Sequence, residues 1–269
     1  MNPGVPCPVS VTGPAAGGGP PAAHDASPTP LRPDGLGGMI EKAWLLSWRV
    51  CDETGHFEVF PDAHFGVGVE LAGGHCRLIS GGPITRHLRV HIGDSEVHWL
   101  RFRPGKLPRI ADVRPRDLVD KPRIVLDRIP GIDFDELGER LTTEGSVRER
   151  LKVLETVFRE KGPAAFCQDR RCRRILEMID AMDGCLRVED LSREFGLSVR
   201  TIQRLLLEQV GLSPKQLMLN VRLQRTIERL KRRTRPHGLS ECASTCGFAD
   251  QSHMIKVFRK QTGRLPSVF

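Results

Sequence analysis

The chain has 269 residues, of which 39% are hydrophobic and 28% are charged, and its formal net charge is +8. No apolar run approaches the roughly 18 residues of a membrane span, and the N-terminus lacks the basic and apolar segments of a signal peptide. The eight cysteines are too dilute and irregularly spaced for a disulfide scaffold. The sequence therefore predicts a cytoplasmic protein with reduced thiols and no membrane partner.

The positive charge is confined to the C-terminal part of the chain. Residues 1–166 hold 21 Lys+Arg and 22 Asp+Glu, a net of −1, whereas residues 167–269 hold 20 and 11, a net of +9. This asymmetry indicates an anion-binding module joined to a neutral one, although a well-solvated helical surface would give the same charge.

The first 38 residues form a segment of unusual composition. They contain 17 Gly or Pro and almost no large apolar side chains. Such a segment buries too little surface to offset its ordering entropy, so we expect residues 1–38 to be a disordered tail. Met39, where patterned sequence begins, is an alternative start of translation.

Short strands are predicted between residues 40 and 130. Apolar or alternating runs cover residues 43–50, 57–60, 66–71, 76–79, 87–92 and 97–102, and turn residues separate them. Many short strands with close turns indicate a small barrel or sandwich. With the helices that follow, they predict a β-rich sensor or dimerisation domain over residues 39–162.

Two helices are predicted after these strands. The first covers residues 134–141, and the second begins at Ser146, with Glu149 completing a capping box. An apolar stripe follows on the second helix. This stripe consists of Val147, Leu151, Leu154 and Phe158. It suits packing onto the strands, and it also suits a helix that pairs two copies of the chain.

Residues 168–269 are predicted to be entirely helical. Helices are expected over 173–182 and 188–195, from Ser198 to Val210, from Pro214 for some 20 residues, and over 239–246 and 251–261. Short helices joined by glycine-containing turns form helix-turn-helix units, and here one long helix connects two of them. The fold class is therefore α+β, with a β-rich N-terminal part and an all-α double helix-turn-helix.

The second helix of the first unit carries side chains suited to base recognition. Arg200, Gln203 and Arg204 lie on its predicted exposed face. Arginine can form two hydrogen bonds with guanine, and glutamine can do so with adenine. A helix of this kind fits the major groove of DNA.

The helical part resembles the paired helix-turn-helix domain of the AraC-type transcriptional regulators. The resembling stretches are LSVRTIQR, GLSPKQLMLNVRLQRTIERL and CGFADQSHMIKVFRKQTGRLP. The resemblance implies that two recognition helices enter adjacent major-groove segments. It places the DNA-binding residues at Ser198, Arg200, Thr201, Gln203, Arg204, Gln251, Ser252 and Lys256. Met254-Ile255-Lys256 departs from the usual aromatic, small polar residue and Arg.

The N-terminal half resembles the sensor half of one AraC-type subgroup more loosely, through PDAHFGVGVEL, SGGPITRH and WLRFRPG. Together the two resemblances imply a sequence-specific transcription regulator that binds double-stranded DNA. They also imply a small-molecule effector, RNA polymerase and a second copy of the chain as further partners. The basic residues on and after the connecting helix suit either phosphate contacts or a solvated surface. They are Arg222, Arg225, Arg229 and the run from Lys231 to Arg235.

Two alternative functions were weighed. A cluster of His87, His91, Glu96 and His98 could hold a metal, which would indicate a metal-dependent β-barrel enzyme with a basic helical appendage. The second alternative function is a helix-turn-helix that binds a protein instead of DNA. Cys242 and Cys246 offer only two thiols and are expected to be small buried residues. No catalytic set, metal site or cofactor motif is predicted, so the chain is not expected to be an enzyme.

Overall fold

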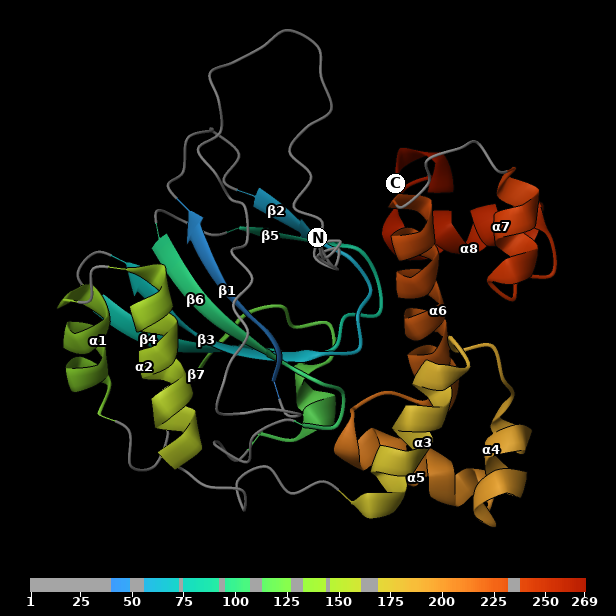
Figure 1. Cartoon of the computed structure of the whole chain (residues 1–269), viewed down its shortest axis with the longest axis horizontal. Helices are drawn as coiled ribbons and strands as arrows, with labels where there is room; N and C mark the ends of the chain where they lie inside the picture. The colour runs from blue at the N-terminus through green and yellow to red at the C-terminus, as the bar shows by residue number, and fades with distance from the viewer. Residues whose placement is uncertain are drawn as a thin grey trace, which may run out of the picture.

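The computed structural model describes residues 40–48, 56–72, 75–91, 95–106, 113–126, 133–143, 146–160, 169–231 and 238–269. The predictions for residues 1–38, Met39, the junction at 162–168 and the cations after Lys231 lie outside these residues. A β-rich N-terminal part and a helical C-terminal part lie side by side (Figure 1). The α+β fold class is confirmed.

The N-terminal part contains two antiparallel sheets. The strands are β1 (Ile40–Trp48), β2 (His56–Val59), β3 (Phe65–Ala72), β4 (His75–Gly81), β5 (Leu88–His91), β6 (Ser95–Phe102) and β7 (Ile124–Leu126). Five of them form one sheet in the order β1-β6-β3-β4-β7, and β2 pairs with β5. In this order the larger sheet is open, with β1 and β7 at its edges. The short strand β7 and the 3₁₀ helix η1 (Pro115–Leu118) were not predicted.

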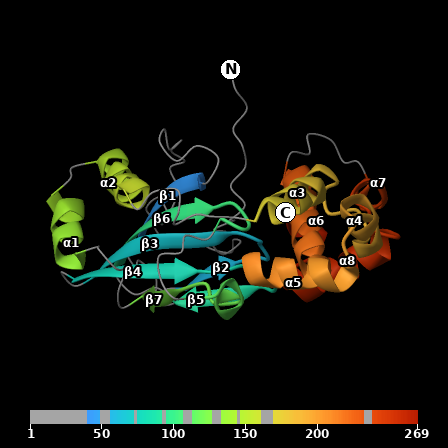
Figure 2. The same ribbon diagram turned by 90° about the horizontal axis from the view of Figure 1, so that it is seen from below.

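One face of the larger sheet forms the main core of this part. Phe65, Val67 and Val69 alternate along β3 and pack with residues of the helices α1 (Phe134–Thr143) and α2 (Val147–Glu160). Leu154 of α2 is fully buried in this cluster, which favours packing onto the strands as the role of the helix. Figure 2 shows both helices at the end of the sheet away from the C-terminal part.

Glycines on the opposite face of β3 make room for a tryptophan. Gly68 pairs with Trp99 of the neighbouring strand β6. A Cβ atom on Gly66 would lie 1.9 Å from the Trp99 ring. Any side chain at residue 66 would therefore displace the indole.

The C-terminal part is a double helix-turn-helix, as predicted. Its helices are α3 (Arg170–Ala181), α4 (Val188–Phe195), α5 (Val199–Gln209), α6 (Pro214–Lys231), α7 (Leu239–Thr245) and α8 (Gln251–Thr262), followed by the 3₁₀ helix η3 (Pro266–Val268). We call α3–α5 the first unit and α7–α8 the second unit. The helix α6 runs between the two units (Figure 1).

Local capping explains where these helices begin and end. The first helix starts at Arg170 and not at residue 173, because the Asp169 carboxylate accepts hydrogen bonds from the backbone N–H groups of Arg171 and Cys172. Gly196 ends α4 with φ +61°, and Gly263 ends α8 with φ +68°. Glycine adopts these left-handed conformations without a Cβ penalty.

Candidate nucleic-acid interface

The helix α5 presents three polar side chains to solvent. Ser198 is its N-cap, and its hydroxyl accepts a hydrogen bond of 3.1 Å from the backbone N–H of Thr201. The buried Ile202, Leu205 and Leu206 fix the opposite face. As predicted, Arg200, Gln203 and Arg204 are exposed.

The turn before α5 holds this helix at a fixed angle to α4. The Ser192 hydroxyl donates a hydrogen bond of 2.6 Å to the Leu197 carbonyl, which lies just before the cap of α5. The backbone N–H of Arg187 donates to the Asp190 carboxylate at the start of α4. Both ends of α4 are therefore held by side-chain hydrogen bonds.

The helix α8 presents a second exposed polar face. The Asp250 carboxylate caps it by accepting a 2.7 Å hydrogen bond from the backbone N–H of His253. Gln251, Ser252 and Lys256 are exposed, whereas Met254 and Phe258 are buried. This burial fixes which face of α8 points outward. Ile255 is half-buried beside Lys256.

Two exposed residues of α8 were missed by the sequence analysis. Arg259 lies seven positions after Ser252, which places it on the same face two turns further along. The His253 ring packs edge-on against Phe248 at 5.8 Å, and its Nδ1 accepts a hydrogen bond from the backbone N–H of Ala249. Extending the helical spacing from Ser252 would have identified Arg259, whereas the His253 contacts needed the structure.

The arginines of α6 form ion pairs and hydrogen bonds within the chain. Arg225 forms ion pairs with Asp180 at 2.8 Å and with Asp183 at 3.2 Å. Arg229 pairs with Asp183 at 3.0 Å, and Arg222 donates to the Gly184 carbonyl at 2.8 Å. These bonds were not predicted from the sequence, and phosphate contact by the three residues stays a prediction. By contrast, Arg200 and Arg204 form no ion pair within the described part of the chain.

The opposite side of α6 contacts the N-terminal part. Asn220 is fully buried, and its side-chain amide donates hydrogen bonds to the carbonyls of Asp62 at 3.0 Å and Ile84 at 2.8 Å. Gln216 donates to the Asn220 side-chain oxygen at 2.9 Å, and Gln224 donates to the Pro61 carbonyl. We call Gln216, Asn220 and Gln224 the amide row. They lie four residues apart, so they share one face of the helix.

The N-terminal part also touches both units directly. The ring of Phe60 lies 5.4 Å from the ring of Phe269, and the Arg264 guanidinium lies 5.5 Å above the Phe60 ring. The backbone N–H of His87 donates to the Gln261 carbonyl at 2.7 Å. Ala63 is buried in the hydrophobic core of the first unit.

An ionic cluster supports the loop that Asn220 contacts. Arg101 is only 3% exposed, and its guanidinium lies 3.0 Å from the Asp62 carboxylate and in contact with His64. Burial alone would raise the pKa of Asp62, but Arg101 and His64 hold it well below its usual range. The Asp62 side chain is therefore charged at neutral pH, in the same residue whose backbone carbonyl accepts the hydrogen bond from Asn220.

The proposed metal cluster is not assembled among the described side chains. His98 is buried in β6, whereas the ring of His87 stacks on Phe60 at the contact with the C-terminal part. The side chains of His91 and Glu96 lie outside the described ones. No group of three His, Cys, Asp or Glu suited to a metal occurs in the described residues. Cys242 and Cys246 are buried, as predicted.

Comparison with known proteins gives the C-terminal part a clear relationship. The family described as Helix-turn-helix domain matches residues 191–269. The transcriptional activator RhaS of Klebsiella pneumoniae (strain 342) is 34% identical over 222 residues, which cover 73% of this chain and 78% of that protein. The RhaS activator of Salmonella arizonae is 34% identical over 73 residues, or 26% of its length.

Solved structures show weaker similarity. ToxT from Vibrio cholerae is 14% identical with a TM-score of 0.41, and the match covers 79% of this chain and 95% of that one. The C-terminal domain of AraT, a response regulator from Geobacillus stearothermophilus, is 20% identical with a TM-score of 0.35, over 37% of this chain and 83% of that one. No helix in the described part of the chain is both long enough and apolar enough to cross a membrane.

Proposed function

The chain belongs to the AraC-type family of DNA-binding transcription regulators, and from this premise we propose that α5 and α8 read two adjacent major-groove segments on one face of DNA. The observation that carries the proposal is the pair of capped, exposed polar helix faces joined by one straight helix. The 18 residues of α6 span about 27 Å, and successive major grooves lie about 34 Å apart. One copy of the chain can therefore reach two consecutive grooves.

The two recognition helices contribute different chemistry to this reading. Arg200, Gln203 and Arg204 supply several hydrogen-bond donors to base edges from α5. On α8, Gln251 and Ser252 supply shorter polar contacts, and Lys256 supplies a positive charge suited to phosphate. The hydroxyls of Ser198 and Thr201 bond to each other at the start of α5, where a backbone phosphate would approach.

The N-terminal part is proposed to control how α5 and α8 meet DNA. The amide row and the Phe60 contacts tie this part to α6 and to the second unit, so a change in the N-terminal part reaches both recognition helices. A small-molecule effector bound by the N-terminal part and a second copy of the chain are the proposed partners of this control. RNA polymerase is the proposed partner of the DNA-bound protein, in the cytoplasm.

Selection of the full chain on a random double-stranded DNA pool tests this function. We expect a preferred site with two short sequence elements, centred about one helical turn apart, and two protected patches on one face of DNA in footprinting. Binding with no sequence preference, or protection of only one short patch, would overturn the proposal.

A further inference from the structure

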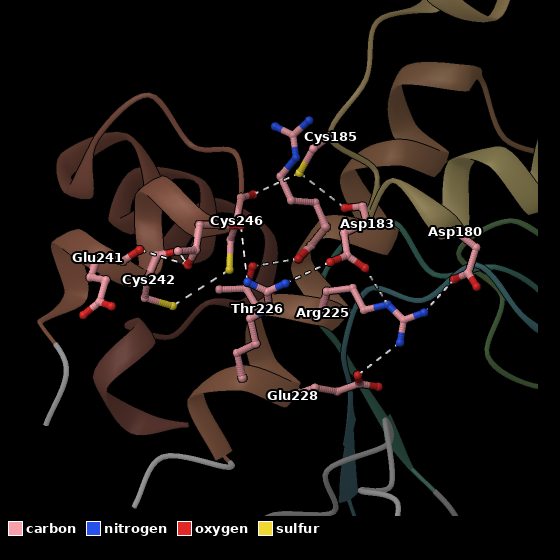
Figure 3. Close-up of polar contacts among 12 residues, drawn as sticks. Asp180, Asp183, Cys185, Arg225, Thr226, Glu228, Glu241, Cys242 and Cys246 are labelled. Carbon is pink, nitrogen blue, oxygen red and sulfur yellow. Dashed lines mark hydrogen bonds and ion pairs between the residues drawn. The ribbon is translucent and has the colours of Figure 1, made fainter. Parts of the chain in front are cut away.

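The turns that follow α3 and α7 meet against α6, although one belongs to each unit. The Cys185 thiol donates to the Cys246 carbonyl at 3.4 Å, directly across the junction (Figure 3). Gly184 has φ +70°, and a Cβ on it would lie 2.2 Å from the Met218 carbonyl oxygen. Gly247 has φ +71°, and a Cβ on it would lie 2.5 Å from the Cys185 sulfur. Both turns therefore need glycine to come this close.

Two arginines of α6 contact both turns at once. Arg222 donates to the Gly184 carbonyl of the first unit at 2.8 Å and to the Gly247 carbonyl of the second unit at 3.2 Å. Arg229 pairs with Asp183 of the first unit at 3.0 Å and donates to the Thr245 carbonyl of the second at 3.3 Å. Each guanidinium uses separate N–H groups for the two units, which its planar fork of donors allows.

A third arginine fixes the acceptor that Arg229 uses. Arg225 donates from Nη2 to Asp180 and lies with Nε 3.2 Å from one oxygen of Asp183, while Arg229 bonds to the other oxygen (Figure 3). Glu228 pairs with Arg225 from the next turn of α6. The Asp183 carboxylate is thus held from two sides.

We propose that Arg222 and Arg229 are positioning residues that set the distance and the rotation between α5 and α8, and thereby the spacing of the two DNA elements that the protein accepts. This inference rests on the proposed function, because spacing has meaning only if both helices read DNA. A single connecting helix can bend and rotate about its ends. Cross-linking the units beside the helix removes those motions.

Direct contact of these arginines with phosphate is the competing role. The guanidinium of Arg222 bonds to two carbonyls and lies 5.8 Å above the Phe248 ring, which orients its donors inward. A phosphate contact would have to use the N–H groups that these two bonds leave over. The two roles differ in their effect on salt dependence, because each lost phosphate contact reduces the slope of log affinity against log salt by about 0.9, whereas a lost positioning contact leaves the slope unchanged.

The test compares DNA duplexes in which the two elements of the selected site are moved apart by one base pair, which changes their relative rotation by about 35°. The full-length wild-type chain should bind the shifted duplex about tenfold or more weakly, as for a mismatched base pair. The double variant Arg222→Ala/Arg229→Ala should lose less than about threefold on shifting, because its units can adjust. Its salt slope should equal that of the wild type.

Two further variants separate geometry from charge and from folding. Arg222→Lys/Arg229→Lys keeps both charges but lacks the planar fork, so it should tolerate the shifted duplex as the alanine variant does. Arg173→Ala removes one charge from an ion pair within α3 and should keep the wild-type spacing preference. Melting temperatures show whether each variant is folded.

The outcomes distinguish this inference from the proposed function. If the arginine variants keep the wild-type penalty for the shifted duplex, or if their salt slope falls, the positioning role is wrong while two-element reading stands. If the wild-type chain shows no spacing preference at all, this inference is overturned, whereas the proposed function fails only if the chain reads no second DNA element.

Discussion

The two helix-turn-helix units share a geometry but differ in their side chains and surroundings. The core of the first unit is mainly aliphatic, and its recognition helix exposes two arginines and a glutamine. The second unit is built around Phe248 and Phe258, with the thiols of Cys242 and Cys246 filling its core. Its recognition helix exposes Gln251, Ser252, Lys256 and Arg259, and the apolar Ile255 between them is half-buried.

The two units also differ in how they contact the N-terminal part. The second unit contacts the N-terminal part through an edge-to-face aromatic pair, Phe60 and Phe269, and a backbone hydrogen bond from His87 to Gln261. The first unit contacts it through apolar groups such as Ala63. Both units therefore contact the N-terminal part, the first through apolar packing and the second through aromatic rings and a backbone hydrogen bond.

The substitution with the largest expected effect on stability lies where the N-terminal part contacts α6. Asp62→Asn leaves the buried Arg101 without its charged partner and should lower the free energy of unfolding by about 3–5 kcal/mol. The pKa of Asp62 is depressed in the folded protein, so its stabilisation is present at neutral pH and is lost as pH falls below about 4. Urea denaturation at several pH values measures the difference, which should narrow in acid.

Glu177→Gln is the matched control for this prediction. Its ion pair with Arg173 is exposed on α3, so the loss should stay below about 1 kcal/mol. An equal loss in both variants would show that the Asp62 cluster does not support the contact between the two parts. Hydrogen exchange at the backbone amide of His87 should also rise in Asp62→Asn, because its hydrogen bond to the Gln261 carbonyl depends on the loops that this cluster holds.

A substitution in the first recognition helix is expected to have a smaller effect, and that effect is on DNA binding. Arg200→Ala should weaken binding to the selected site by about 1–3 kcal/mol and relax selectivity at one or two base positions. Titration with the selected site and with scrambled DNA measures both effects. Equal weakening on the two DNAs would show that α5 does not read bases through Arg200.

The smallest effect is expected in the second recognition helix. Gln251→Ala should cost less than Arg200→Ala, because the neutral glutamine amide offers two N–H donors and the charged guanidinium offers five. Lys256→Ala should instead weaken binding evenly across sequences and reduce the salt slope by about 0.9, as expected for one phosphate contact. A larger loss from Gln251→Ala than from Arg200→Ala would reverse the assignment of roles to the two units.

Local signals predicted the helical part closely. The caps Ser198 and Asp250 and the stop signals Gly196 and Gly263 lie where the structure places the helix ends. These signals act within one turn, so they can be read without knowing the fold. In the N-terminal part the three-residue strand β7 was missed, because so short a run carries no periodicity.

The contacts between units could not be read in the same way. Asp183 and Arg229 lie 46 positions apart, and Asn220 and Asp62 lie 158 apart. Periodicity identifies which face of α6 a residue occupies but not what that face meets. The arginines of α6 were therefore open to two interpretations from sequence, and neither included the bonds that they form.

The arrangement of contacts around α6 restricts how a signal can pass along it. The amide row and the arginines lie on opposite sides, since Asn220 and Arg222 are separated by about 200° around the helix. Turning α6 about its own axis would break both sets of bonds at once. We therefore expect α6 not to rotate about its own axis. The N-terminal part can detach from α6 or move together with α6, but it cannot rotate one recognition helix relative to the other by turning α6.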